Sequence, residues 1–144
     1  MLFRSSGSSV GGTTELVGAS SGRCLDVFNN QTTPGTKVEI WDCNNGANQR
    51  WTPTAQSELR VYNGTQCLDA FGAQTSPGTK VELWTCNGGT NQQWRLNPDG
   101  TVTGVQSGLC LDVTGGDVPT GNVNGVAVEL WTCNGGANQQ WSLR

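Results

Sequence analysis

Three short motifs contain the side chains that could do chemistry in this chain, and each motif occurs three times. Cys-Leu-Asp supplies one carboxylate, and Val-Glu-Ile/Leu-Trp supplies a second carboxylate and an indole. Asn-Gln-x-Trp supplies two neighbouring amides and a further indole. Carboxylates accept hydrogen bonds, amides accept and donate them, and an indole offers a flat apolar face. These groups together suit a ligand that has several hydroxyls and one apolar face.

The same residue types recur in every copy of the motifs. The carboxylates are Asp26 with Glu39, Asp69 with Glu82, and Asp112 with Glu129, and the indoles beside them are Trp41, Trp84 and Trp131. The amide pairs are Asn48 with Gln49, Asn91 with Gln92, and Asn138 with Gln139. A pyranose can pack its axial C–H bonds on an indole while its hydroxyls pair with carboxylates and amides, so this set predicts a sugar site.

The spacing of the motifs predicts a repeat protein. Cys-Leu-Asp recurs at intervals of 43 residues, and the third copy is four residues longer, in the segment Val118–Gly125. A period of about 20–50 residues is typical of repeat architectures. Propellers need at least about four blades, whereas this chain has three copies, at about 15–54, 55–97 and 98–144. We expect an all-β, closed threefold arrangement, with about four short strands per copy around a shared core.

Strand alternation separates the core face from the outer face. Residues two apart on a strand share a face, so Val38 and Ile40 point inward together, and Glu39 and Trp41 point outward. In Cys-Leu-Asp-Val, the leucine and valine point inward, which leaves Cys24 and Asp26 on the outer face. We therefore expect the carboxylate beside the first cysteine to face the indole beside the second.

Six cysteines and no histidine favour disulfides over a metal site. Pairing within repeats is the one connectivity that treats the three copies alike, and it gives Cys24–Cys43, Cys67–Cys86 and Cys110–Cys133. Disulfides form in oxidising compartments, so we expect a secreted, extracellular protein. The sequence predicts no cofactor.

Charge and composition exclude several classes of partner. The net charge is −3, with 8 basic and 11 acidic residues, so nucleic acid and anionic membrane surfaces are not expected partners. No apolar run approaches the roughly 20 residues that span a bilayer. Residues 1–14 are too polar for a signal peptide, and we interpret them as a linker or a cloning remnant ahead of a domain over 15–144. A signal peptide would then lie upstream, on a longer natural chain.

Some of these residues also have a purely structural interpretation. The second indole of each copy, at Trp51, Trp94 and Trp141, is expected in the core. The first indole could cover the disulfide, and the aspartates could cap backbone N–H groups of turns. The glutamines could equally satisfy buried backbone groups or a ligand.

The three motif sets, in register with six cysteines, closely resemble the ricin B-type lectins. They are most similar to the family 13 carbohydrate-binding modules attached to bacterial glycoside hydrolases, over about residues 14–144. The resemblance implies a non-catalytic β-trefoil with three shallow sugar pockets. It assigns the vicinal sugar hydroxyls to the aspartates, the aromatic platform to the first indoles and polar contacts to the Asn-Gln pairs. A further polar contact falls on Asn44, Asn87 and Asn134.

The chain departs from that family pattern at one position of each pocket. Glu39, Glu82 and Glu129 stand where family members often have glutamine, and an ionised glutamate cannot donate a hydrogen bond. Two carboxylates in one pocket also repel, which can raise a pKa. Lys37 is expected to screen the first pair, and Ala127 replaces that lysine in the third copy. The third pocket also has the longer segment Val118–Gly125, so it is expected to differ in affinity from the others.

These observations favour a polysaccharide-binding module that targets an attached glycoside hydrolase to xylan, arabinan, galactan or a similar glycan. We expect this domain to be a monomer that is tethered, in the natural chain, to a catalytic domain that hydrolyses the glycan. The alternative is a ricin-type, galactose-binding lectin of the cell surface. The Asp–Glu pairs could be imagined as glycosidase carboxylates, but a shallow site excludes water poorly. A trefoil that makes only protein contacts would bind no sugar, and the intact motif sets argue against it.

Overall fold

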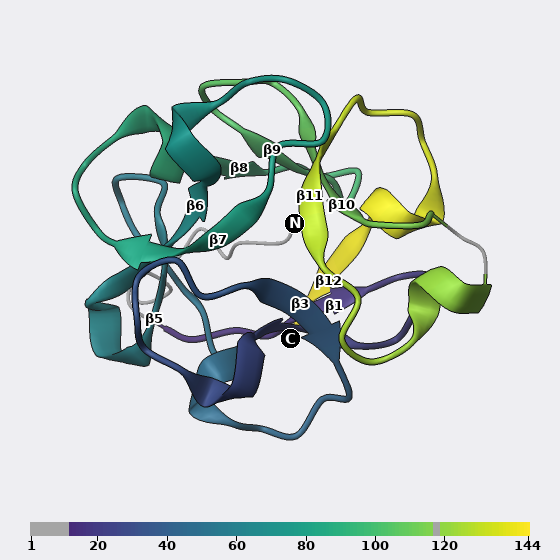
Figure 1. The fold of residues 1–144 in the computed structure, drawn as a ribbon, viewed down its shortest axis with the longest axis horizontal. Helices are drawn as coiled ribbons and strands as arrows, with labels where there is room; N and C mark the ends of the chain where they lie inside the picture. Colours follow the sequence, from purple (N-terminus) through teal and green to yellow (C-terminus); the bar gives the residue numbers. More distant parts are fainter. Residues whose placement is uncertain (1–11, 117–118) are drawn as a thin grey trace.

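The computed structural model describes residues 12–116 and 119–144, which form three similar lobes around a central axis (Figure 1). The predicted linker at residues 1–14 lies mostly outside the described residues. Twelve strands occur in the described part: β1 Leu16–Gly18, β2 Cys24–Val27, β3 Val38–Trp41, β4 Thr52–Pro53, β5 Leu59–Val61, β6 Gln66–Ala70, β7 Val81–Thr85, β8 Trp94–Leu96, β9 Val102–Gly104, β10 Cys110–Val113, β11 Val128–Trp131 and β12 Trp141–Leu143. The all-β class and the four strands per copy are confirmed.

Short 3-10 turns connect many of these strands. They are η2 Phe28–Asn30, η3 Ala47–Gln49, η4 Tyr62–Gly64, η5 Phe71–Ala73, η6 Thr90–Gln92, η7 Pro119–Asn122 and η8 Ala137–Gln139. The Asn-Gln pairs are the last two residues of η3, η6 and η8. Each of these turns directly follows a glycine in extended conformation. None of the described residues forms a helix long and apolar enough to cross a membrane.

The sheets are offset from the sequence repeats by one strand. Their orders are β12-β1-β2-β3, β4-β5-β6-β7 and β11-β10-β9-β8, so the last strand of each copy pairs with the first strand of the next. The ring closes where β12 pairs with β1, with Leu16 opposite Leu143 and Gly18 opposite Trp141. No copy can complete its own sheet, which explains why the three must fold together.

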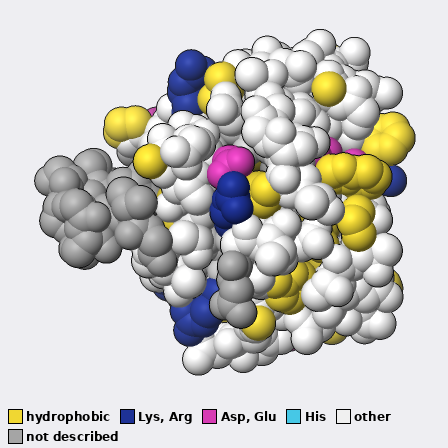
Figure 2. All heavy atoms as spheres, turned by 90° about the vertical axis from the view of Figure 1, so that its left-hand side faces the viewer, with side chains coloured by type: hydrophobic (Ala, Val, Ile, Leu, Met, Phe, Trp, Pro, Cys, Tyr) yellow, Lys and Arg dark blue, Asp and Glu magenta, His cyan; other side chains and the backbone are white. Residues whose placement is uncertain are grey.

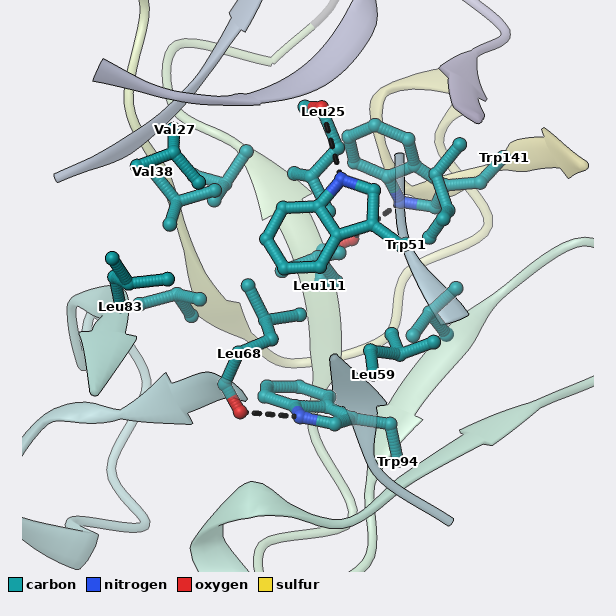
Figure 3. Close-up of a cluster of buried hydrophobic side chains, with 14 of the residues drawn as sticks. Leu25, Val27, Val38, Trp51, Leu59, Leu68, Leu83, Trp94, Leu111 and Trp141 are labelled. Carbon is teal, nitrogen blue, oxygen red and sulfur yellow. Dashed lines mark hydrogen bonds between the residues drawn. The ribbon is translucent and has the colours of Figure 1, made fainter. Parts of the chain in front are cut away.

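The core lies on the inner face that strand alternation predicts. Leu25, Val27, Val38 and Ile40 are all fully buried, as are their counterparts in the other copies. The second indoles are also buried, and they come together among leucines of all three copies (Figure 3). Each indole Nε1 donates to a leucine carbonyl of the adjacent Cys-Leu-Asp motif, over 3.1, 3.0 and 3.1 Å for Leu25, Leu68 and Leu111. The core placement of Trp51, Trp94 and Trp141 is confirmed.

All three disulfides pair as predicted, within repeats, at a Cα–Cα distance of 5.1 Å in each case. Each disulfide ties the start of the Cys-Leu-Asp strand to the residues just after the neighbouring strand. The bridge therefore closes the end of the hairpin that carries the carboxylates and the exposed indole.

A glycine from one copy supports the exposed indole of another. Gly125 N donates to Ile40 O over 2.8 Å, and a Cβ at Gly125 would lie 3.8 Å from the ring of Trp41. Its φ of +92° favours glycine. Gly35 against Trp84 and Gly78 against Trp131 repeat this arrangement around the threefold axis. Each candidate site therefore rests on two copies of the repeat.

The two kinds of tryptophan allow one substitution to be compared in two environments. Trp51→Phe removes a buried N–H donor and leaves a void, so we expect a loss of about 1–3 kcal/mol in the free energy of unfolding. Trp41→Phe occurs at a ring that is 41% exposed, and it should change stability by less than about 0.5 kcal/mol. Urea unfolding with the disulfides intact measures both, and equal losses would contradict this assignment of core and surface.

Candidate functional site

The two carboxylates of each copy lie directly opposite each other on neighbouring strands. The register pairs Asp26 with Glu39 across β2 and β3, Asp69 with Glu82 across β6 and β7, and Asp112 with Glu129 across β10 and β11. Directly opposed residues have Cβ atoms about 4.5–5.5 Å apart and share a face of the sheet. The sequence prediction that these groups come together is confirmed.

The outer face of this hairpin is less open than strand alternation predicts. Asp26 is 3% exposed and Glu39 is 2% exposed, and Cys24 is fully buried. The physical reason is that the Asn-Gln turn folds over the hairpin and covers Asp26, whereas Glu39 pairs with Ala127 of the third copy and lies beside Lys37. Strand parity identifies the face on which a side chain lies, but it does not report what a distant turn places on top of that face.

Two amides hold the aspartate from above. Asn48 Nδ2 and Gln49 Nε2 donate to Asp26 Oδ2 over 3.2 and 2.8 Å. Asp69 and Asp112 accept the same pair of hydrogen bonds, over 3.2 and 2.9 Å and over 3.1 and 2.8 Å. The aspartates therefore accept from amide side chains of the turn and do not cap its backbone. Amide donors favour the charged form of the carboxyl group, so these hydrogen bonds lower the pKa of Asp26 and Asp69 against the larger raising effect of burial.

The glutamines are buried beneath the site and hold its segments together. Gln49 is fully buried, its Oε1 accepts from Asn44 N over 2.9 Å, and its Nε2 also donates to Asp42 O over 3.0 Å. Gln92 and Gln139 repeat these bonds and are equally buried. Their polar atoms are satisfied inside the protein. The structural interpretation therefore accounts for all three glutamines, and a ligand would meet the neighbouring asparagines first.

The predicted site residues line an open depression in the first and third copies. Asp26, Glu39, Trp41, Asn44 and Asn48 line a first depression of about 470 Å³. Asp112, Glu129, Trp131, Asn134 and Asn138 line the corresponding one of about 620 Å³ in the third copy. The first indoles are 41–42% exposed, so they offer a ring face to solvent and do not merely cover the disulfides. Asn87 and Asn91 occupy the same places in the second copy, beside Trp84.

Burial gives each glutamate an unusual protonation state. Loss of solvent, together with the hydrogen bond and negative charge of Asp26, raises the pKa of Glu39 to about 7. Glu82 and Glu129 also have a pKa of about 7, with desolvation first and the paired aspartate second. The pKa of Asp26 is raised mainly by burial, against the lowering effect of its hydrogen bonds. A protonated glutamate can donate a hydrogen bond, as the glutamine of family members does.

A lysine screens the first pair, as predicted. Lys37 Nζ lies 3.6 Å from Glu39 Oε1 and lowers the glutamate pKa against the stronger effects of burial and Asp26. Lys80 acts on Glu82 in the same direction. Ala127 takes the place of the lysine in the third copy, so Glu129 has no such counter-charge from that position.

Several residues at the first site escaped the sequence reasoning. Phe28, Asn29 and Asn30 of η2 line the depression opposite the Asn-Gln turn. Tyr62 of the second copy donates its hydroxyl to Asn30 Oδ1 over 3.2 Å, and burial raises its pKa to about 12. The signal for Phe28 was present, because an exposed aromatic follows the same Asp-x dipeptide in the first two copies.

The longer segment of the third copy also reaches the first site. Asp117 and Val118 lie outside the described residues, and the turn that follows packs on the first copy. Asn124 Oδ1 accepts from Arg23 Nε and from Asp42 N, over 2.7 Å each, directly beside Trp41. The insertion was expected to change the third pocket. Gly115 and Gly116, which precede this segment, line that pocket, whereas Asn124 within it contacts the first copy.

The described residues offer no thiolate for a metal ion. The grouping of Glu15 with Cys24 and Cys43 is compact enough to hold one, but both sulfurs are bonded in a disulfide. An ordinary cysteine site for zinc needs free thiolates.

Comparison with known proteins places this geometry in a family. A designed threefold-symmetric protein, ThreeFoil, is 34% identical, with a TM-score of 0.82 over 91% of this chain and 96% of its own. An exo-β-1,3-galactanase from Clostridium thermocellum (23% identity, TM-score 0.76) matches over 92% of this chain, which spans 30% of its length. The C-half of an earthworm R-type lectin, solved with GalNAc, is 20% identical, with a TM-score of 0.73 over 92% of this chain and 98% of its own.

The last two likenesses show the fold alone, and that fold is the predicted β-trefoil. The family description "Ricin-type beta-trefoil lectin domain" matches residues 12–141, which include all three sets of paired carboxylates, exposed indoles and amides. This chain belongs to the ricin-type β-trefoil lectin domain family.

Proposed function

We propose that this chain is a non-catalytic module that binds glycans through three shallow sites, one in each copy. One observation carries the proposal: in every copy an indole that is 41–42% exposed lies beside a carboxylate held by two amides. The exposed ring provides an apolar platform, and the fixed carboxylate provides a strong hydrogen-bond acceptor. Both are in place before a ligand arrives.

A pyranose would use these groups in a simple way. Its C–H face would pack on Trp41, and neighbouring hydroxyls would donate to Asp26 and to Asn48 Oδ1, because the Asn48 amide group already donates to Asp26 and to Val27 O. Asn44 lies at the exposed rim, where its side chain can reach a further hydroxyl. Protonated Glu39 would donate its one proton to Asp26, so the pair would present a single negative charge to the ligand.

The chemistry of the site favours uncharged sugars. On the face seen in Figure 2, few side chains are charged, and most of the surface is uncharged polar groups and backbone. The earthworm lectin half was solved with GalNAc, and the Clostridium enzyme is a galactanase. We therefore propose galactose-containing glycans as the first ligand class to test, followed by xylan and arabinan.

Three weak sites on one rigid body suit a polymer. A shallow single site corresponds to a Kd of about 0.1–1 mM, or roughly −4 to −5.5 kcal/mol. Binding at a second site becomes intramolecular once the first is occupied, so a polysaccharide with repeated units gains avidity. We propose that the domain acts outside the cell, where its three disulfides persist, and that it targets an attached glycoside hydrolase to its substrate. A galactose-binding cell-surface lectin is the second candidate, and the same site physics supports it.

Retention on insoluble polysaccharide tests the proposal. The triple variant Trp41→Ala, Trp84→Ala, Trp131→Ala should lose at least about tenfold in affinity for whichever of galactan, xylan or arabinan retains the wild type, because each site loses its platform. Affinity electrophoresis or a depletion isotherm measures the change.

A second triple variant separates binding from folding. Asp26→Asn, Asp69→Asn, Asp112→Asn keeps the shape of each side chain and removes the charge, and it should also weaken retention. Unchanged circular dichroism would show that both variants are folded. Wild-type retention by both folded variants would rule out these sites as the binding sites.

The glutamate pKa values predict that acid favours both binding and stability. The folded-state pKa of about 7 exceeds the ordinary value of 4.5, so the folded protein binds more protons than the unfolded chain between those values. This contribution to stability is fully present below about pH 4.5 and is lost as the pH rises through about 7. Above that pH a second negative charge faces each aspartate, and the donor is gone.

We therefore expect Tm and sugar affinity both to fall between about pH 5 and pH 8. The variant Glu39→Gln, Glu82→Gln, Glu129→Gln keeps a neutral donor at every pH, so its two profiles should be flatter. Thermal unfolding and glycan titration at matched ionic strength measure them. Parallel profiles for wild type and variant would show that the glutamates do not titrate in this range.

A further inference from the structure

We infer that the three sites are unequal: the first and second each bind two adjoining sugar units, whereas the third binds one. Phe28 and Phe71 provide the second platform in the first and second sites. This inference rests on the proposed function, because it specifies what each of its sites holds.

Phe28 meets the requirements for a sugar platform. It is 41% exposed, and it lines the same depression as Trp41, Asp26 and Asn48. Phe71 is 44% exposed at the matching position of the second copy. A large exposed aromatic ring is costly to leave in water, and it is more informative when it borders a polar site than when it is isolated.

A lysine holds each of these rings. Lys37 Nζ lies 5.5 Å from the centroid of the Phe28 ring, and Lys80 Nζ lies 5.0 Å from that of Phe71. Lys37 Nζ also donates to Gly125 O over 2.9 Å, which ties the phenylalanine turn to the neighbouring copy. Both distances are within the range of cation–π attraction, about 6 Å. The lysine is a positioning residue, and the ring is the contact residue.

The third copy lacks both members of this pair. Thr114 replaces the phenylalanine, and Ala127 replaces the lysine. Thr114 Oγ1 donates to Ala127 O over 2.6 Å, so its side chain is turned back to the backbone. The phenylalanine and the lysine are therefore present together twice and absent together once, as expected for two residues that act as one unit.

The backbone does not explain the difference between the copies. Phe28 N, Phe71 N and Thr114 N donate to the matching carbonyls of residues 37, 80 and 127 over 3.0, 2.9 and 3.1 Å. The size of the depression does not explain it either, because the third is larger, at about 620 Å³ against about 470 Å³. Gly115 and Gly116 line the third depression where the first has η2 side chains. Among the residues that the structure describes, the third site lacks a second apolar face.

The ligand that fits the first and second sites is a disaccharide unit of a neutral glycan. Its first ring would pack on the tryptophan and bond the aspartate, and its second ring would pack on the phenylalanine. The third site would take a single terminal or branching residue. Two of the sites would each bind two sugar units along a glycan chain, and the third would bind one terminal or branching unit. This combination would favour a branched polysaccharide.

Single-site chains test this inference directly. Tryptophan-to-alanine changes at two of the three indoles leave one active site, and each chain is titrated with galactose against N-acetyllactosamine and with xylose against xylobiose. We expect the disaccharide to bind about tenfold more tightly than its monosaccharide at the first and second sites, and within about twofold at the third.

Side-chain variants then identify the cause. In the first-site chain, Phe28→Ala should abolish the disaccharide advantage by lowering disaccharide affinity about tenfold. Lys37→Met keeps the apolar stem but removes the cation, and it should reduce that advantage in part. In the third-site chain, Thr114→Phe with Ala127→Lys should create the advantage. Thermal unfolding confirms that each variant is folded.

The outcomes distinguish this inference from the proposed function. A disaccharide advantage equal at all three sites would overturn the inference while the proposed function stands. Equal losses of monosaccharide and disaccharide affinity in folded Phe28→Ala would also overturn it, because the ring would then serve the first sugar. Failure of the folded wild type to bind either pair of sugars, or any of the polysaccharides, would overturn both.

Discussion

The site depends on a buried carboxylate that is shared between a strand and a distant turn. Asp26 lies on β2, and Asn48 and Gln49, which bond it, lie on η3 more than 20 residues later. A carboxylate that is 3% exposed would be costly without such partners. The hydrogen bonds from the two amides offset that cost, and they also hold the turn over the hairpin. Gln49 also accepts from Asn44 N, so the same arrangement fixes the backbone of the rim asparagine.

This interaction also explains why the Asn-Gln dipeptide precedes a core tryptophan. Gln49 faces the aspartate and the backbone of the hairpin, and Trp51, two residues later, enters the core and bonds Leu25 O. The same short segment therefore ties the outer face of the hairpin to its inner face. Its three copies place three indoles around one core, which closes only when β12 pairs with β1 (Figure 3). Function and stability share the same contacts, so a change in one affects the other.

The threefold symmetry is less complete at the surface than in the core. The buried leucines, the disulfides and the Asp-Asn-Gln clusters repeat closely, because each must fit the same interior. The residues around the rim of each site are free to differ, and they do. Phe28 with Lys37 has a counterpart in the second copy and none in the third, and the third copy's longer segment contacts Asp42 of the first. Because the three sites differ at their rims while the core beneath them is the same, one small domain can recognise different parts of a glycan.

Much of this was determined by the sequence itself. Repetition at a constant interval gave the number of copies, alternation in Val-Glu-Ile-Trp separated Ile40 from Trp41, and the requirement that copies be alike gave the disulfides. These features are local or periodic, so residue spacing is sufficient to find them. The pairing of Asp26 with Glu39 followed because a disulfide beside them restricts the register of the hairpin.

Only the tertiary structure decided what covers each group and what reaches it from elsewhere. The burial of Asp26 and Glu39, the internal role of Gln49, and the support of Trp41 by Gly125 all arise from residues distant in sequence. The raised pKa of Glu39 has the same origin, because desolvation depends on the whole surrounding shell. Periodicity tells on which face a side chain lies, whereas packing of separate segments decides whether that face meets water, a ligand or another part of the chain.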